Sequence, residues 1–96
     1  MERPEDRDLI EQVLAGNQRA FAVLVERYGR EMYARISRTV RYPEDAEDLV
    51  QDVFVRAHSR LGQLRDTNRF PAWLRVIADN AARAWHRPAS SAGQVV

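Results

Sequence analysis

One apolar stripe near the end of the sequence restricts the chain to helical folds more than any other feature. Between residues 70 and 87, apolar side chains recur at the three- and four-residue spacing of an α-helix. They are Phe70, Trp73, Leu74, Ile77, Ala81, Ala84 and Trp85. A second set, mostly basic, repeats every four residues and is predicted to form a polar row away from the stripe. Its members are Arg75, Asp79, Arg83 and Arg87.

Two segments near the start of the chain have the same helical spacing. The first has an apolar patch at Leu9, Ile10, Val13 and Leu14. Gly16 follows as a stop signal, and Asn17 is a good N-cap for the next helix. That second helix carries an apolar stripe of Phe21, Leu24, Val25, Tyr28, Met32 and Ile36. Gly29 lies within it, and we interpret this glycine as a point of close helix–helix approach.

A third helix is predicted to begin at Pro43, a residue that suits the first turn. Its core face is predicted to consist of Val50, Phe54, Ala57 and Leu61. Residues 62–69 form a polar loop, the last helix follows, and Pro88 stops it. We therefore expect an all-α fold, a compact four-helix bundle over residues 1–87, with a linker or disordered tail at residues 88–96.

Composition limits the classes of protein that this chain can represent. Its 96 residues, 45% hydrophobic and 30% charged, suit one soluble domain with a modest core. The absence of cysteine excludes disulfides and thiolate metal sites. The apolar runs are far shorter than the roughly 20 residues of a membrane span, so we expect a cytoplasmic protein without membrane insertion.

Charge is separated along the chain although the net charge is only +1. Residues 44–52 hold five carboxylates and no base, whereas residues 60–87 hold six arginines against two aspartates. An acidic helix and an arginine-rich helix can hold two partners of opposite charge at the same time.

Catalysis has little support, and no cofactor is expected. Neither histidine belongs to a cluster with metal-ligand spacing, and no glycine-rich phosphate loop is present. Glu44, Asp48 and Asp52 line up at i, i+4 and i+8, but no histidine accompanies them, as the Glu-x-x-His pattern of di-iron bundles requires. A helical carboxylate metalloprotein remains an alternative that elemental analysis would test.

Three motifs carry a family resemblance over roughly residues 6–87. Residues 48–54, DLVQDVF, resemble the DLxQ(E/D)xF motif of bacterial sigma factors of the extracytoplasmic-function (ECF) group. Residues 70–80 are similar to the FxxWLxxIAxN motif of the same group, at the expected spacing. Leu14-Ala15-Gly16-Asn17, followed by Phe21, Leu24 and Tyr28, is similar to the start of the same domain, conserved region 2.

The resemblance implies a protein that binds core RNA polymerase and recognises and melts the promoter −10 element. In the family, the acidic third helix binds the clamp helices of the largest polymerase subunit, and Asp48, Gln51 and Asp52 occupy the matching positions. Carboxylates and an amide can accept hydrogen bonds from arginines on a facing helix. The C-terminal domain that reads the upstream promoter element is not in this chain, which implies a fragment or a stand-alone region.

The resemblance also implies how the loop and the last helix meet DNA. In the family, a base of the nontemplate strand is flipped out and held in a pocket that the loop builds. Asn80 matches the family's DNA-contacting asparagine. Arg65, Asn68 and Arg69 are candidates for base and backbone contacts, and Arg75, Arg83 and Arg87 for phosphate contacts. Phe70 and Trp73 could stack on bases, but their place on the apolar stripe favours core packing.

Three residues depart from the family pattern. Val76 stands where arginine or lysine is frequent, Asp79 where a basic or apolar residue is usual, and Ala84 where aspartate is frequent. We expect Asp79 to pair within its helix with Arg75 and Arg83, one turn away on either side, and to neutralise part of the arginine row. This departure leaves a second alternative, a sigma-like interaction module whose main partner is an anti-sigma protein.

Overall fold

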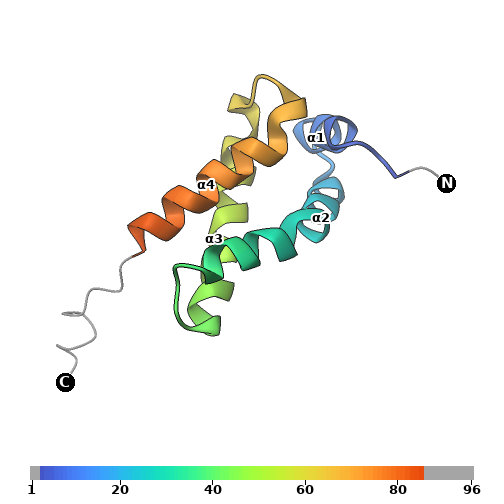
Figure 1. Cartoon of the computed structure of the whole chain (residues 1–96). Coiled ribbons are helices and arrows are strands. Elements are labelled where there is room, and N and C mark those ends of the chain that lie inside the picture. Colours follow the sequence, from blue (N-terminus) through green and yellow to red (C-terminus); the bar gives the residue numbers. More distant parts are fainter. Residues whose placement is uncertain (1–2, 86–96) are drawn as a thin grey trace.

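The computed structural model describes residues 3–85, which contain four α-helices and two short 3-10 turns (Figure 1). The helices are α1 (Asp6–Leu14), α2 (Gln18–Ser37), α3 (Pro43–Arg60) and α4 (Phe70–Ala84). The turns η1 (Leu61–Gln63) and η2 (Thr67–Arg69) occupy the expected loop between α3 and α4. The all-α four-helix prediction is confirmed. The predicted tail at residues 88–96 and Arg87 lie outside the described residues.

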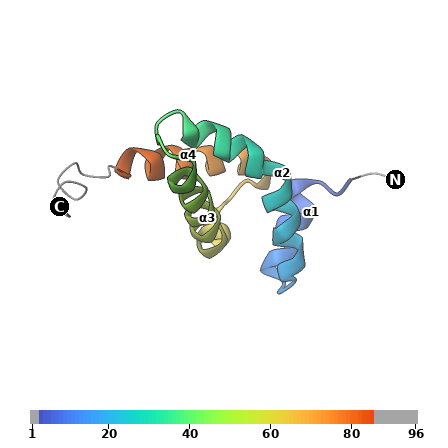
Figure 2. The same cartoon turned by 90° about the horizontal axis from the view of Figure 1, so that it is seen from below.

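Helix α2 holds the fold together because it packs against each of the other three helices. In Figures 1 and 2, α3 crosses α2 and α4, and α1 lies at the end of α2 that is remote from the α2–α3 loop. Helix α4 also packs against α3, and α1 contacts the two turns of the α3–α4 loop. The loop is therefore supported by helices on both sides.

The core is built from hydrophobic side chains of all four helices, and no polar or charged side chain of residues 3–85 is buried. Phe70, the first residue of α4, is fully buried, and the ring of Tyr28 meets it edge-on with 5.6 Å between ring centroids. Its assignment to the core is confirmed. Because burying an unpaired charge is costly, the charged residues that could bind partners all keep some contact with solvent.

Local signals at the helix ends behave as the sequence predicts. Gly16 has φ of +108°, and the backbone N–H groups of Gly16 and Asn17 donate to the carbonyls of Val13 and Gln12, both at 2.9 Å. This is the Schellman arrangement that ends many helices. The Asn17 side chain then caps α2 by accepting from the backbone N–H of Arg19 at 3.1 Å, and Pro43 lies in the first turn of α3.

Several expected core positions are more exposed than their spacing indicates. Leu14, the last residue of α1, is 57% exposed, and Val50 is half-buried because the core face of α3 centres on Leu49 and Val53. Helix α4 ends at Ala84, since Trp85 has the non-helical ψ of 81°. Ala84 is exposed and Trp85 is 37% exposed, so the apolar stripe does not extend to them.

The expected close approach at Gly29 is also wrong. A Cβ built on Gly29 meets no atom within 4 Å, and neither does one built on Gly16. The two glycines therefore differ in backbone conformation and not in available space. Gly16 is required by its positive φ, whereas Gly29 only weakens the helix that contains it.

We predict opposite effects from alanine at these two positions. Gly16→Ala should lower the free energy of unfolding by about 1–2 kcal/mol, because alanine is strained at positive φ. Gly29→Ala should raise it by up to about 1 kcal/mol through better helix propensity. Urea denaturation of both variants measures this. A destabilised Gly29→Ala variant would show that this face of α2 is closely packed after all.

Candidate functional site

The α3–α4 loop is ordered by its own hydrogen bonds. Leu61 is buried at its start, and Asp66 caps the η2 turn by accepting from the backbone N–H of Asn68 at 3.0 Å. The backbone N–H of Arg69 donates to the carbonyl of Asp66 at 2.9 Å. These bonds fix the backbone of residues 66–69 and place Arg69 directly before the first turn of α4.

This loop and the start of α4 enclose an open pocket of about 350 Å³. Its lining residues are Leu64, Arg65, Asp66, Arg69, Ala72, Trp73 and Val76. Two of the predicted DNA-contacting residues, Arg65 and Arg69, therefore share one pocket, whereas Asn68 is exposed on the same loop. The pocket combines two guanidinium groups with an apolar wall from α4, a combination that suits a planar polar ligand.

Trp73 does not have the fully buried position that its place on the stripe predicts. Its side chain is half-buried, packs against the core beside Phe70 and lines the pocket with its accessible part. Val76, one turn further along α4, is 56% exposed and was not predicted as a site residue. Its spacing from Trp73 is the signal that could have placed it on the same outward face.

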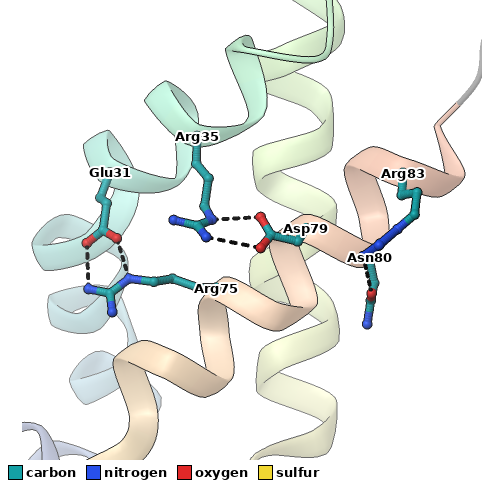
Figure 3. A network of polar contacts seen from close by, with 6 residues as sticks. All are labelled: Glu31, Arg35, Arg75, Asp79, Asn80 and Arg83. Atoms are coloured by element: carbon teal, nitrogen blue, oxygen red, sulfur yellow. Dashed lines mark hydrogen bonds and ion pairs between the residues drawn. The ribbon is translucent and has the colours of Figure 1, made fainter.

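Asn80 and Arg83 lie further along α4 and are both exposed. Arg83 Nη2 donates to Asn80 Oδ1 at 3.0 Å. Figure 3 shows this pair on the side of α4 that is turned away from α2. The amide Nδ2 of Asn80 has no hydrogen-bond acceptor among the described residues, so it is available to an external acceptor.

Arg75 and Asp79 face α2 instead, where they form two ion pairs that we call the α2–α4 ladder (Figure 3). Arg75 Nε lies 2.5 Å from Glu31 Oε2, and Arg35 Nε lies 2.6 Å from Asp79 Oδ1. In each pair a second nitrogen of the guanidinium reaches the other carboxylate oxygen, at 3.4 Å and 3.0 Å respectively. Both pairs are thus bidentate, and the second hydrogen bond is shorter in the Arg35–Asp79 pair.

The ladder corrects the expected polar row of α4. Asp79 pairs with Arg35 and not with Arg75 or Arg83 in its own helix, because the Glu31–Arg35 and Arg75–Asp79 spacings bring opposite charges together between the two helices. Hydrogen bonding to Arg75 lowers the pKa of Glu31, and hydrogen bonding to Arg35 lowers the pKa of Asp79. Both carboxylates are therefore charged at neutral pH, and Arg75 is engaged with Glu31.

The acidic residues of α3 lie on another surface. Asp48 and Gln51 are exposed, and neither has a side-chain hydrogen-bond or ion-pair partner within residues 3–85. Asp52 is partly buried and pairs with Arg56 one turn later, with 2.8 Å between Oδ2 and Nε. Asp48 and Asp52 also line a hollow whose other side is formed by Ala81 and Ala84 of α4 and by Trp85 directly after it.

A network between α1 and α2 stabilises the loop end of the bundle and was not predicted. Asp6 accepts from Arg27 Nη1 at 2.8 Å and from the Tyr28 hydroxyl. Burial and the hydrogen bond to Asp6 raise the pKa of Tyr28 to about 12, so its phenol stays protonated. Because the Tyr28 ring contacts Phe70, this network supports the first turn of α4.

The described residues can also be checked for a metal site and for a membrane-spanning helix. Within residues 3–85, no group of three or more histidine, aspartate or glutamate side chains could hold a metal ion. This part of the chain also has no helix that is both long and apolar enough to cross a membrane.

Comparison with known proteins gives one family. Residues 24–91 match the sequence model of Sigma-70 region 2. The chain is 37% identical over 79 residues to the RNA polymerase sigma-H factor of Pseudomonas aeruginosa, which covers 82% of this chain and 41% of that protein. It is 37% identical over 95 residues to the ECF RNA polymerase sigma-E factor of Escherichia coli, which covers 94% of this chain and 49% of that protein.

A solved structure has the same fold. It is an NMR structure of an engineered region 2 of sigmaE in complex with GTAAAA, with a TM-score of 0.80 and 38% sequence identity. The match covers 88% of each chain. The present chain spans about half the length, or less, of the two curated relatives it matches.

We predict that the α2–α4 ladder makes the fold sensitive to acid. A carboxylate whose pKa is lowered by folding contributes stability above its ordinary pKa, and this contribution is lost as the pH falls through the lowered value. The ordinary values are 4.5 for Glu31 and 3.8 for Asp79. Urea denaturation from pH 6 to pH 2.5 should therefore show a loss of stability that begins below about pH 4.5 and is shallower in the Glu31→Gln, Asp79→Asn double variant.

The control is Glu11→Gln, which changes an exposed carboxylate of α1 that has no ion pair among the described residues. It should leave the slope of stability against pH close to that of the wild type. Equal slopes in the wild type and the double variant would mean that the ladder does not form in solution.

Proposed function

This chain belongs to the sigma-70 region 2 family, in its ECF group, and on that premise we propose that it binds core RNA polymerase and recognises and melts the promoter −10 element. The observation that carries the proposal is the outward face of α4. There Trp73 and Val76, which line the pocket of the α3–α4 loop (the loop pocket), and Asn80 follow one another at helical spacing. The solved structure with the same fold, an engineered region 2 of sigmaE, is a complex with GTAAAA.

We assign the loop pocket to one flipped base of the nontemplate strand. Arg65 and Arg69 would donate to the base edge or the adjacent phosphates, and Trp73 and Val76 would contact the plane of the base. Asn68 lies beside them on the loop. Flipping costs unstacking energy, which is lower once the strand is melted, and stacking on an aromatic side chain offsets part of it.

Asn80 is the proposed reader of a neighbouring position. Its Nδ2 can donate to a base acceptor, while Arg83 holds Oδ1 and remains close enough to meet a phosphate. Arg75 was also predicted to contact phosphate, but its bidentate pairing with Glu31 reduces its availability. The pairing of Asp79 with Arg35 has the opposite effect, because it balances a carboxylate that would repel DNA.

The proposed polymerase contact is the acidic surface of α3. Asp48, Gln51 and Asp52 would accept hydrogen bonds from basic side chains on the clamp helices of the largest subunit. Asp48 and Gln51 need no rearrangement for this, whereas Asp52 would have to share or exchange Arg56. In this proposal the protein acts in the cytoplasm by binding alone, without a cofactor, and an anti-sigma protein would compete by covering the same surfaces.

We expect base reading and charge to be separable at the DNA surface. Asn80→Ala should weaken binding to single-stranded −10 DNA more than to a scrambled strand and leave the salt dependence unchanged. Arg69→Ala should weaken binding to the −10 strand and to the scrambled strand alike. It should also reduce the slope of log affinity against log salt by about one neutralised phosphate.

The measurement is a titration of labelled oligonucleotides, with core polymerase present, at several salt concentrations. Arg19→Ala, an exposed arginine at the start of α2, is the control and should change neither quantity. If Asn80→Ala and Arg69→Ala both behave like the control, this face does not meet DNA and the anti-sigma interaction module becomes the better account.

For the polymerase surface, the Asp48→Arg, Asp52→Arg double variant should abolish copurification with core RNA polymerase while helicity stays intact. The charge reversal places two arginines opposite the basic side chains expected on the polymerase, which they would repel. Asp8→Arg, Glu11→Arg makes the same change in charge on the exposed face of α1 and should still copurify. Retention of the α3 double variant on the polymerase would remove this assignment.

A further inference from the structure

A second hollow, of about 290 Å³, lies at the surface between α3 and the C-terminal end of α4. Asp48, Asp52 and Arg56 line it from α3, and Trp85 lines it from the end of α4. Leu49 and Ala81, both buried, lie between them. We call this hollow the Trp85 groove. It is distinct from the loop pocket, which lies at the other end of α4.

The charges of the groove select a cation. Arg56 neutralises Asp52, whereas Asp48 has no ion-pair partner among residues 3–85. These three lining side chains therefore carry a net charge of one negative unit. A phosphate or a carboxylate would be repelled by the two aspartates. A cation would be attracted by the unpaired Asp48, and the indole of Trp85, which also lines the groove, can attract a cation through its π-electrons.

The shape and apolar parts of the groove favour arginine over a small cation. The side chain of arginine has an apolar stem, which can cover the exposed Ala84 in the groove, and a planar head that stacks on aromatic rings and forks to carboxylates. Trp85 is 37% exposed. Tryptophan is among the residues that contribute most of the binding energy in protein interfaces. An arginine on a partner would bury this indole.

We propose that the Trp85 groove takes an arginine side chain from a helix of core RNA polymerase, which extends the polymerase-binding surface from α3 onto the end of α4. The inference rests on the proposed function, because it adds to the contact assigned to Asp48, Gln51 and Asp52. It makes Trp85 the central apolar contact of that surface. The guanidinium then lies between the carboxylate of Asp48 and the indole.

Arg56 has a defined role in this arrangement. Its guanidinium pairs with Asp52, at 2.8 Å, and so occupies one of the two carboxylates that an incoming arginine could use. It also repels that arginine. Removing the charge of Arg56 should therefore strengthen polymerase binding, an effect that damage to the fold cannot imitate.

The experiment compares dissociation constants for core RNA polymerase, measured by the anisotropy of the labelled chain. Trp85→Ala should weaken binding about thirtyfold, the lower limit for an interface hot spot, and Trp85→Phe should weaken it less. Arg56→Gln should tighten binding severalfold. Tyr42→Ala, which removes another exposed aromatic residue, is the matched control and should have no effect. Thermal unfolding of each variant confirms that the fold is retained.

The results separate this inference from the proposed function. If the Asp48→Arg, Asp52→Arg variant loses the polymerase but Trp85→Ala and Arg56→Gln bind like the wild type, the groove does not receive a cation and the inference is overturned, while the α3 contact stands. If the double charge reversal also has no effect, both are overturned. A weaker Trp85→Ala variant together with a tighter Arg56→Gln variant supports the groove.

Discussion

The burial of α4 against both α2 and α3 is the contact on which the proposed surfaces depend. Six of its side chains are buried, and three of these are the small residues Ala78, Ala81 and Ala82, which let the neighbouring helices come close. Phe70 anchors the first turn, so the loop pocket is held at one end of the helix. The groove beside Trp85 lies at the other end. One packed helix thereby fixes the separation between the pocket proposed to meet DNA and the groove proposed to meet protein.

The ion pairs decide which charges remain for partners. Since no charged side chain of residues 3–85 is buried, each arginine is either paired at the surface or open to solvent. Arg27, Arg35, Arg56 and Arg75 hold carboxylates of their own chain, whereas Arg65 and Arg69 have no ion pair among the described residues. The arginine count of residues 60–87 therefore overstates the charge that DNA would meet. Of the arginines without an ion pair, Arg65 and Arg69 line the loop pocket, and Arg83 lies further along α4.

Features set by neighbouring residues could be predicted from the sequence, and features set by distant residues could not. Helical spacing, the Gly16–Asn17 boundary and Pro43 all act within a few residues, and the helices form where they indicate. The partner of Asp79 is 44 residues away, so the spacing within α4 indicates an intrahelical pair and only the α2–α4 packing brings Arg35 to it. Likewise Trp85 continues the apolar period but lies beyond the last helical residue, where the period no longer determines burial. The family motifs predict DNA and polymerase contacts that remain predictions, and they do not indicate Leu64, which the folded loop brings to the pocket, or Val76, which lines the pocket from α4.

The most direct test of the account is the binding of a labelled single-stranded −10 oligonucleotide to core RNA polymerase with and without this chain. The anisotropy of the label should rise to saturation only when chain and polymerase are both present, and a scrambled strand should compete poorly. That result would join both surfaces in one complex. A titration curve that is the same with and without the chain, or that is equally well suppressed by the scrambled strand, would contradict the claim that this domain reads the −10 element.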